Sequence, residues 1–389
     1  MNVLRRSVSF TFLLTVALGL GSVRSANAQP NLDAVRATVT LGGTVGAIGS
    51  QGIALDPVTG LVYIVINGTI TGFCDVDPLK DPSAPRTRRY GDNQMSIINP
   101  STAREIALVP TGGAPVWPTV DPIRRVVFVA NSGSGTVTIH DAATGAAAGT
   151  IEVGGMPHMG GLDYTTRLMV VGNTVSRGDT AATQNHSSIV DTPTNRVTRE
   201  FQSGPAPHGM AVDQERHLAY FTSVGDGSIT VVNMTTGQDL FSAVPKSIYG
   251  TAQGNNNMLA RQAATRRLFQ ANSQSGYAGA LVIDEVTLKA EGLIRFGSFN
   301  PWGLWVDEPN RLLFAALPNA NAIGVADLDT LTHVATIPVG ACPYSVAVDP
   351  ERHIGATSNQ GSSTVGSSSS IFDACVVYKA AGRVVSGCP

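Results

Sequence analysis

Two histidines are the residues of this sequence that are best suited to chemistry. His158 and His208 lie in similar local contexts, and each directly follows a proline. A neutral imidazole binds divalent metals, and it acts as a general acid or base near neutral pH. If the fold brings the two rings together, they form a metal site or a catalytic pair. The alternative is structural, because a histidine after proline also suits a turn in which the ring bonds to neighbouring backbone.

Three further side chains extend this hypothesis to a reaction. In a β-elimination, one histidine would remove a proton next to a carboxylate, Arg261 would hold that carboxylate, and Tyr344 would protonate the leaving oxygen. His186, in the insertion Thr174–Ser188, is a candidate third metal ligand. Arg261 also has a structural alternative, since an unpaired charge inside a buried strand is costly and a nearby carboxylate would satisfy it. A divalent metal is the cofactor that these residues suggest, and its identity stays open.

An internal repeat determines where these residues lie. An apolar strand that ends in Asp recurs, and a second apolar strand is centred seven residues later, as in Val120-Asp121 followed by Phe128. The Asp position falls at Asp56, Asp121, Asp163, Asp213, Gln262, Asp307 and Asp349, where Gln262 marks a degenerate copy. Seven copies therefore fill the chain.

Each copy predicts four short strands. The first two are followed by a third apolar run such as Thr136–Asp141 and a fourth such as Thr150–Gly154, separated by Gly, Pro, Asn and Asp turns. Almost no helical periodicity is present, and this pattern is typical of an all-β, seven-bladed β-propeller with four-stranded antiparallel blades. A solenoid would need polar capping repeats, which we do not find. The predicted blades span residues 44–113, 114–155, 156–205, 206–253, 254–299, 300–341 and 342–389 of a single domain over residues 29–389.

The repeats resemble the YVTN family of propeller repeats. The stretch Val127–Asn131 fits the second-strand motif of that family, and Ala335–Gly340 fits its Thr-Ile-Pro-Val-Gly strand. The resemblance covers essentially the whole chain after the N-terminal segment. It implies the propeller fold but no particular activity, because the family and its relatives include binding proteins, surface-layer components, lyases, lactonases and dehydrogenase subunits.

The repeat register predicts which residues line one mouth of the central channel. Strands one and two of a blade are antiparallel, so the start of strand one and the end of strand two share a rim. Five residues before the Asp position stand Gln51, Val116, His158, His208, Asn257, Trp302 and Tyr344, and ten residues after it stand Ile66, Asn131, Asn173, Ser223, Asn272, Leu317 and Asn359. We expect ligand contacts from the amides of Gln51, Asn131, Asn173, Asn257, Asn272 and Asn359. Trp117, Trp302 and Tyr344 would stack a planar or sugar ring, or simply fill space.

Two of the four cysteines predict a bonded hairpin near the C-terminus. Cys375 and Cys388 flank the runs Val376–Tyr378 and Val384–Ser386 around an Ala381-Gly382 turn. Counted outward from that turn, the cysteines lie opposite each other, where paired Cβ atoms are close enough for a disulfide. Such bonds suit an oxidising compartment, and free buried thiols are the alternative.

The other two cysteines bear on how the ring closes. Cys74 lies in the long loop of blade one and Cys342 begins the inner strand of blade seven, so a Cys74–Cys342 disulfide would latch two blades that become neighbours on closure. The segment Arg36–Leu41 predicts a further strand on the outside of blade seven. Whether this strand or the C-terminal hairpin completes the last blade stays open.

The N-terminus predicts a signal peptide over residues 1–28. Arg5 and Arg6 precede an apolar run from Phe10 to Leu20, and Ala26-Asn27-Ala28 supplies a cleavage pattern of small residues. The run is too short for a membrane span, and no later apolar stretch reaches that length. We therefore expect a secreted or periplasmic protein without a membrane span after signal removal.

Composition excludes some function classes and leaves three hypotheses. Charged residues make up 14% of the chain, hydrophobic residues make up 43%, and the formal net charge is −2, which gives no basic footprint for nucleic acid. The first hypothesis is a non-catalytic propeller that binds a small molecule or a protein at the channel mouth. The second is a lyase or lactonase that uses the paired histidines, with or without a metal. The third is a subunit that partners a redox protein.

Overall fold

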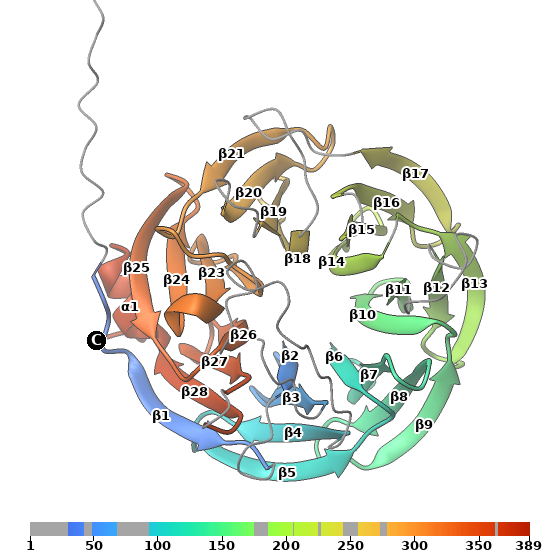
Figure 1. The fold of residues 1–389 in the computed structure, drawn as a ribbon, viewed down its shortest axis with the longest axis horizontal. Coiled ribbons are helices and arrows are strands. Elements are labelled where there is room, and N and C mark those ends of the chain that lie inside the picture. Colours follow the sequence, from blue (N-terminus) through green and yellow to red (C-terminus); the bar gives the residue numbers. More distant parts are fainter. Residues whose placement is uncertain are drawn as a thin grey trace, which may run out of the picture.

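The structure is a computed structural model, and it is a ring of seven four-stranded sheets. Figure 1 shows the sheets arranged around a common centre, with the first strand of each blade innermost. The structure describes residues 30–42, 49–67, 93–174, 186–204, 206–224, 227–243, 256–272, 278–361 and 365–389. All pairings within the sheets are antiparallel, so the predicted seven-bladed β-propeller is confirmed.

The first four blades follow the repeat in chain order. Blade one comprises β2 (Ser50–Leu55), β3 (Val62–Ile66), β4 (Gln94–Asn99) and β5 (Arg104–Pro110). Blade two comprises β6 (Pro115–Asp121), β7 (Val126–Asn131), β8 (Thr136–Asp141) and β9 (Ala147–Glu152). Blade three comprises β10 (Met156–Asp163), β11 (Leu168–Thr174), β12 (His186–Asp191) and β13 (Arg196–Gln202). Blade four comprises β14 (Pro207–Asp213), β15 (Leu218–Ser223), β16 (Ile229–Asn233) and β17 (Gln238–Ala243).

The last three blades bring the chain back to its start. Blade five comprises β18 (Asn256–Gln262), β19 (Arg267–Asn272), β20 (Gly279–Asp284) and β21 (Ala290–Ile294). Blade six comprises β22 (Leu304–Asp307), β23 (Leu312–Leu317), β24 (Ala322–Asp327) and β25 (Thr332–Pro338), with the short 3-10 helix η1 (Pro318–Ala320) after β23. Blade seven comprises β26 (Pro343–Asp349), β27 (Ile354–Asn359), β28 (Ser368–Asp373) and the N-terminal strand β1 (Val35–Thr40).

Burial follows the position of a strand in its blade. Every residue of β3 and β23 is buried, because the faces of the second strand pack against the two neighbouring blades. The outer strand β5 instead alternates between exposed and half-buried residues. This difference explains why inner strands appear in the sequence as continuous apolar runs, whereas outer strands alternate.

The repeated aspartate closes the turn between strands one and two. In blade two, Asp121 Oδ1 accepts the backbone N–H groups of Ile123 and Arg124, both at 3.0 Å. The aspartates of blades three, four and seven accept the equivalent pairs of N–H groups. The aspartate is therefore a structural signature of the blade, at the rim opposite the start of strand one.

The N-terminal strand closes the ring. β1 pairs antiparallel with β28 from Val35 opposite Phe372 to Thr40 opposite Ser368. Figure 1 shows this blue strand on the outside of blade seven, beside the red C-terminal strands. The predicted strap is confirmed, and of the two closures left open by the sequence, the N-terminal strand is the one observed.

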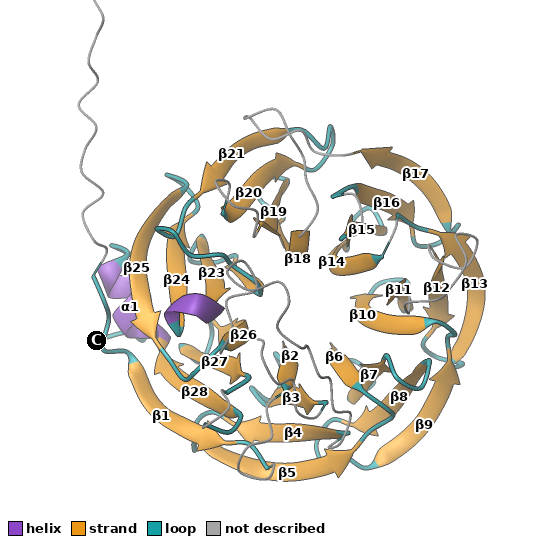
Figure 2. Cartoon of the chain, viewed as in Figure 1, coloured by secondary structure: helices purple, strands orange, loops and turns teal. Residues whose placement is uncertain are grey.

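The predicted C-terminal hairpin is wrong, because residues Ala374–Ala380 form the helix α1. Asp373 caps its first turn by accepting the N–H of Cys375 at 2.8 Å. Gly382, with φ of 70°, ends it, and the N–H of Arg383 donates to the carbonyl of Tyr378 at 2.8 Å. Figure 2 shows the helices, in purple, only beside blades six and seven. The short apolar run Val376–Tyr378 therefore packs on those blades as one face of a helix rather than as a strand.

The Cys375–Cys388 disulfide is present, with a Cα–Cα distance of 5.2 Å, although it joins α1 to the chain end rather than two strands. Cys342 is also disulfide-bonded. Its expected partner, Cys74, lies outside the described residues, as does the predicted signal peptide. No helix among the described residues has the length and apolarity to cross a membrane.

Candidate functional site

A β-bulge opens the innermost strand of six blades. In blade three, Pro157 pairs with Asn173 and Met159 with Gly172, so His158 is the extra residue. The register shifts at the same place in blades one, two, four, five and seven. A bulge bends a strand and turns its unpaired side chain in a new direction. The position five residues before the aspartate is therefore a bulge position on a rigid inner strand.

Two neighbouring bulges bring the histidines together. The imidazole rings of His158 and His208 have centroids 3.8 Å apart and an interplanar angle of 37°. Both residues are half-buried, and they come from β10 and β14, which are adjacent in the ring. Rings in such contact offer two nitrogen ligands to a metal, or an acid and a base within reach of one substrate.

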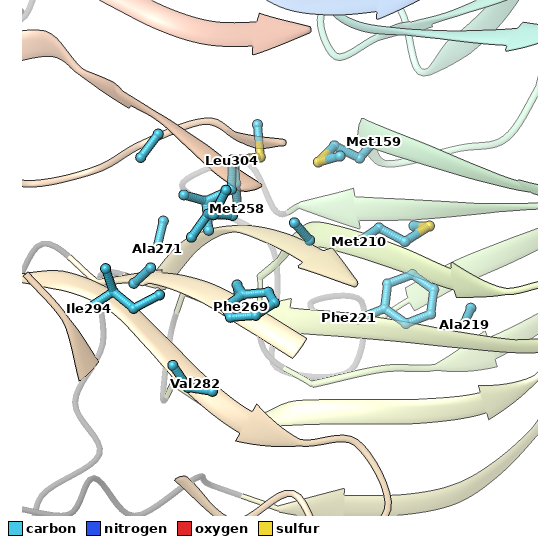
Figure 3. Close-up of a cluster of buried hydrophobic side chains, with 14 of the residues drawn as sticks. Met159, Met210, Ala219, Phe221, Met258, Phe269, Ala271, Val282, Ile294 and Leu304 are labelled. Carbon is cyan, nitrogen blue, oxygen red and sulfur yellow. The ribbon is translucent and has the colours of Figure 1, made fainter. Parts of the chain in front are cut away.

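A buried apolar cluster extends along the inner strands of four blades. Met159, Met210, Met258 and Leu304 belong to one buried cluster and are between 3% and 9% exposed. Figure 3 shows these side chains, which come from four consecutive blades, gathered near the inner strands. None of the four was among the predicted site residues, although the three methionines each follow a bulge position by one or two residues.

Two aromatic residues lie five residues before the repeated aspartate in blades six and seven, Tyr344 at a bulge and Trp302 just before β22, which has no bulge. Trp302 and Tyr344 meet edge to face, with ring centroids 5.0 Å apart and an interplanar angle of 79°. Tyr344 is 6% exposed, whereas Trp302 is half-buried. Figure 1 places β26, which carries Tyr344, across the ring from β10 and β14. The burial of Tyr344 suits space filling, and Trp302 is the more accessible ring of the pair.

Trp117 packs between blades one and two. A Cβ atom added to Gly52 would lie 2.5 Å from Cε3 of Trp117, so the indole occupies the space that a side chain at Gly52 would need. Gln51, the bulge residue of blade one, is 8% exposed. Gln51 is therefore less accessible than the two histidines, whereas Trp117 is half-buried as they are.

The asparagines expected at the mouth are buried inside the blades instead. The exposed fractions of Asn131, Asn173, Asn272 and Asn359 are 0%, 3%, 6% and 0%. Asn131 Nδ2 donates to the carbonyl of Val129 at 2.9 Å and to the hydroxyl of Thr138 at 3.1 Å. Asn359 Nδ2 likewise donates to Ser368 and Ser370 in the third strand of its own blade. The second strand lies one strand spacing behind the channel, so its terminal amides satisfy the blade rather than a ligand.

Arg261 is engaged far from the histidines, which corrects its expected role beside them. Its Nε donates to Glu285 Oε2 at 2.7 Å, and its Nη2 lies 3.1 Å from Asp213 Oδ2. Both carboxylates have side chains that are 0% exposed. Arg261 follows Asn256 by five residues in β18, which places it roughly 16 Å along the strand from the bulged rim. The structural alternative for this arginine is the observed one.

His186 and Asn257 fall at the edge of what the structure describes. The backbone of His186 begins β12, the third strand of blade three, about 10 Å outward from β10 at the usual strand spacing. The side chains of His186 and Asn257 lie outside the described residues, so their expected roles stay predictions. Among the described residues, a group of three side chains able to ligate a metal is found elsewhere, at His353, Cys375 and Cys388.

Comparisons with known proteins support the propeller fold, but they show neither a family nor an activity. No protein-family model matches the sequence, so membership of the YVTN family is not shown. No curated protein matches it either. Among solved structures, the chain is similar to the Kuenenia stuttgartiensis hydrazine synthase, with a TM-score of 0.65 and 14% sequence identity over 86% of this chain and 97% of that one. At this identity the similarity shows a shared propeller fold and does not transfer an activity.

Proposed function

We propose that this chain is an exported binding propeller whose ligand site is the channel rim at blades three and four. The observation that carries the proposal is the contact between the His158 and His208 rings, with centroids 3.8 Å apart. Export follows from the predicted signal peptide, and the Cys375–Cys388 disulfide is compatible with an oxidising location.

The blade itself does not require imidazoles at these positions. Equivalent bulges hold Gln51 in blade one, Val116 in blade two and Tyr344 in blade seven, and those blades form the same four-stranded sheet. Two histidines in adjacent blades are therefore a local departure from what the fold needs. Functional groups are held most accurately when they stand on the regular elements of a scaffold, as these do.

The surroundings define the class of ligand. Two half-buried imidazoles supply nitrogen ligands or hydrogen bonds, and Met159 and Met210 of the same two inner strands belong to a buried apolar cluster. Such a site suits a small molecule that has an apolar or planar body and an anionic or metal-bound head. Because Asn131, Asn173, Asn272 and Asn359 are buried, the proposed specificity rests on the histidine pair.

A thermal-shift titration tests this proposal. Zn²⁺, Ni²⁺ and small aromatic carboxylates are added to the wild type and to the His158→Ala and His208→Ala variants. Because a ligand that binds only the native protein raises its melting temperature, we expect a concentration-dependent rise for the wild type that each variant loses. The matched control is His217→Ala, which removes a histidine at the opposite rim, where its Nδ1 lies 2.7 Å from Asp163. Equal shifts in all four proteins, or none in the wild type, would overturn the proposal.

The second candidate is a lyase or lactonase, and the same ring contact favours it. Two touching imidazoles can serve as base and acid in turn, but Arg261 no longer provides a site for the substrate carboxylate. Activity toward polyuronides or lactones in the wild type, lost in both His158→Ala and His208→Ala but kept in His217→Ala, would establish the enzyme. Binding without turnover would leave the binding propeller as the function.

A further inference from the structure

A second group of metal-ligating side chains lies at the other end of the chain. The ligand atoms of His353, Cys375 and Cys388 all lie within 4.8 Å of one another. They come from three segments: the turn between β26 and β27, the first turn of α1, and the penultimate residue of the chain. In the structure the two sulfurs are joined in a disulfide, and the imidazole stands beside it.

We infer that reduction of the Cys375–Cys388 disulfide converts this group into a zinc site with two thiolates and one imidazole. A dithiol reductant supplies two electrons and two protons, the S–S bond breaks, and the reductant becomes its own disulfide. Zn²⁺ then binds both sulfurs and a nitrogen of neutral His353, and the two thiol protons pass to solvent. Cys₂His is an established ligand set for zinc, and it leaves a fourth position open to water or a ligand.

The imidazole is held in place independently of the disulfide. His353 adopts a φ of 56°, and its carbonyl accepts the N–H of Ala374 at 3.0 Å, which ties this turn to the start of α1. Its ring stands edge-on to Tyr378, with centroids 6.1 Å apart. A Cβ added to Gly387 would lie 3.0 Å from Cε1 of His353, so the ring also packs on the last residues of the chain. The nitrogen ligand therefore stays near the sulfurs when they separate.

The sulfur of Cys388 is the one that can move. Two thiolates on a tetrahedral zinc ion lie about 3.8 Å apart, since each Zn–S bond is about 2.3 Å. Cys375 is fixed by α1, where its N–H donates to Asp373. Cys388 lies outside α1 and is preceded by Gly387, whose φ is 87°. A shift of Cys388 by about 2 Å therefore opens the site without disturbing the helix.

Such a metal would replace the disulfide as the link that holds α1. Tyr378 of α1 donates to Asp307 Oδ2 of blade six at 2.7 Å, so the helix joins blades six and seven. Burial, followed by the charge of Asp307, raises the pKa of Tyr378 above its usual value, so the phenol remains a donor. In the reduced protein, the proposed zinc ion would keep α1 attached to blades six and seven.

The test is a cobalt titration of the full-length mature protein after reduction and removal of the reductant. Co²⁺ is a zinc analogue whose thiolate bonds give charge-transfer absorption in the near ultraviolet. We expect one equivalent to bind to reduced wild type with this band, and Zn²⁺ to displace it. His353→Ala should weaken the affinity at least about tenfold, as the loss of a supporting group at a metal site commonly does. Cys388→Ser should abolish the band at one equivalent.

Matched variants separate this site from the other cysteines and histidines. His217 occupies the same turn position in blade four and contacts Asp163, so His217→Ala should bind Co²⁺ like the wild type. Alkylation followed by peptide mass spectrometry provides a second measurement that needs no variant. Zn²⁺ should protect Cys375 and Cys388 of the reduced wild type, but it should not protect Cys342. A reduced wild type without the band, or equal affinity in His353→Ala, would refute the inference. Neither result depends on the His158 and His208 pair.

Discussion

At the scale of single residues, several ion pairs among the described residues join neighbouring blades. The second carboxylate oxygen of Asp56 lies 3.1 Å from Arg125 of the next blade, and that of Asp163 lies 2.7 Å from His217. Between blades four and five, the carboxylate of Glu285 forms salt bridges with Arg216, Arg261 and Arg266. Arg261 is the least exposed of these three cations, at 12% for its side chain. Its function is structural.

Arg261→Ala should lower the free energy of unfolding by about 3 kcal/mol, because Glu285 and Asp213 then lose a partner that is almost wholly buried. Urea unfolding at pH 7 measures the change. Arg267→Ala is the control, since Arg267 and Glu291 form an exposed pair, and less than about 1 kcal/mol should be lost. If Arg261 instead bound the ligand, Arg261→Ala would leave the free energy of unfolding unchanged and would weaken ligand binding beside His158 and His208.

Repeating the same comparison in acid tests the charge on Asp213. Burial by itself would raise the pKa of Asp213, but the hydrogen bond from Arg216 and the charge of Arg261 outweigh it and hold that pKa below its usual value. A lowered native pKa stabilises the protein above the unfolded value of about 3.9, and this stabilisation is lost as the pH falls through the native pKa. The stability difference between wild type and Arg261→Ala should therefore shrink below about pH 4. A difference that stays constant to pH 2 would contradict this account.

At the scale of elements, blade seven is the one blade assembled from both ends of the chain. β1 covers β28, which would otherwise present a free edge of unpaired backbone groups. The segment before β1 also reaches blade six, where the N–H of Leu32 donates to the carbonyl of Thr336 at 2.8 Å. β1 buries Val39 in the cluster shared with blade one and leaves Thr38 exposed. β1 and the segment before it therefore hold together the neighbouring blades six, seven and one.

Val39→Ala should lower the free energy of unfolding by about 1–2 kcal/mol, since about 0.8 kcal/mol is lost for each buried methylene. Thr38→Ala, one residue away on the exposed face, should change it by less than about 0.5 kcal/mol. Guanidinium unfolding followed by tryptophan fluorescence measures both variants. If the two substitutions cost the same, the strap does not contribute through the packing of this face.

At the scale of the whole molecule, ring closure depends on links between segments distant in sequence. Arg352 of blade seven pairs with Asp349 and donates to the carbonyl of Val58 in blade one at 2.8 Å. The disulfide fixes α1 at the boundary between blades six and seven, where Tyr378 donates to Asp307 of blade six. Together with β1, these links stabilise the closed ring, because each restricts the conformations of a terminal segment.

Replacing Cys375 and Cys388 together by alanine should lower the free energy of unfolding by about 3 kcal/mol. The bond closes a loop with a sequence separation of 13, and a loop of this length restricts the unfolded chain by about that amount. Differential scanning calorimetry at neutral pH measures the change against Val384→Ala, an exposed position in the same tail. An unchanged melting temperature would show that the tail does not stabilise the ring.

The repeat period and the apolar runs of the chain are local signals, and they suffice to predict the seven-bladed ring and the N-terminal strand outside blade seven. The Cys375–Cys388 disulfide was also predicted, although from a hairpin that does not form. The same repeat places His158 and His208 at equivalent positions, but what each side chain contacts there depends on tertiary packing. Whether an amide such as Asn131 faces a ligand or a neighbouring strand, and whether Arg261 meets a carboxylate, depends on residues far away in the chain. The helix α1 was missed for the same reason, since a short apolar run takes its conformation from the surface on which it packs.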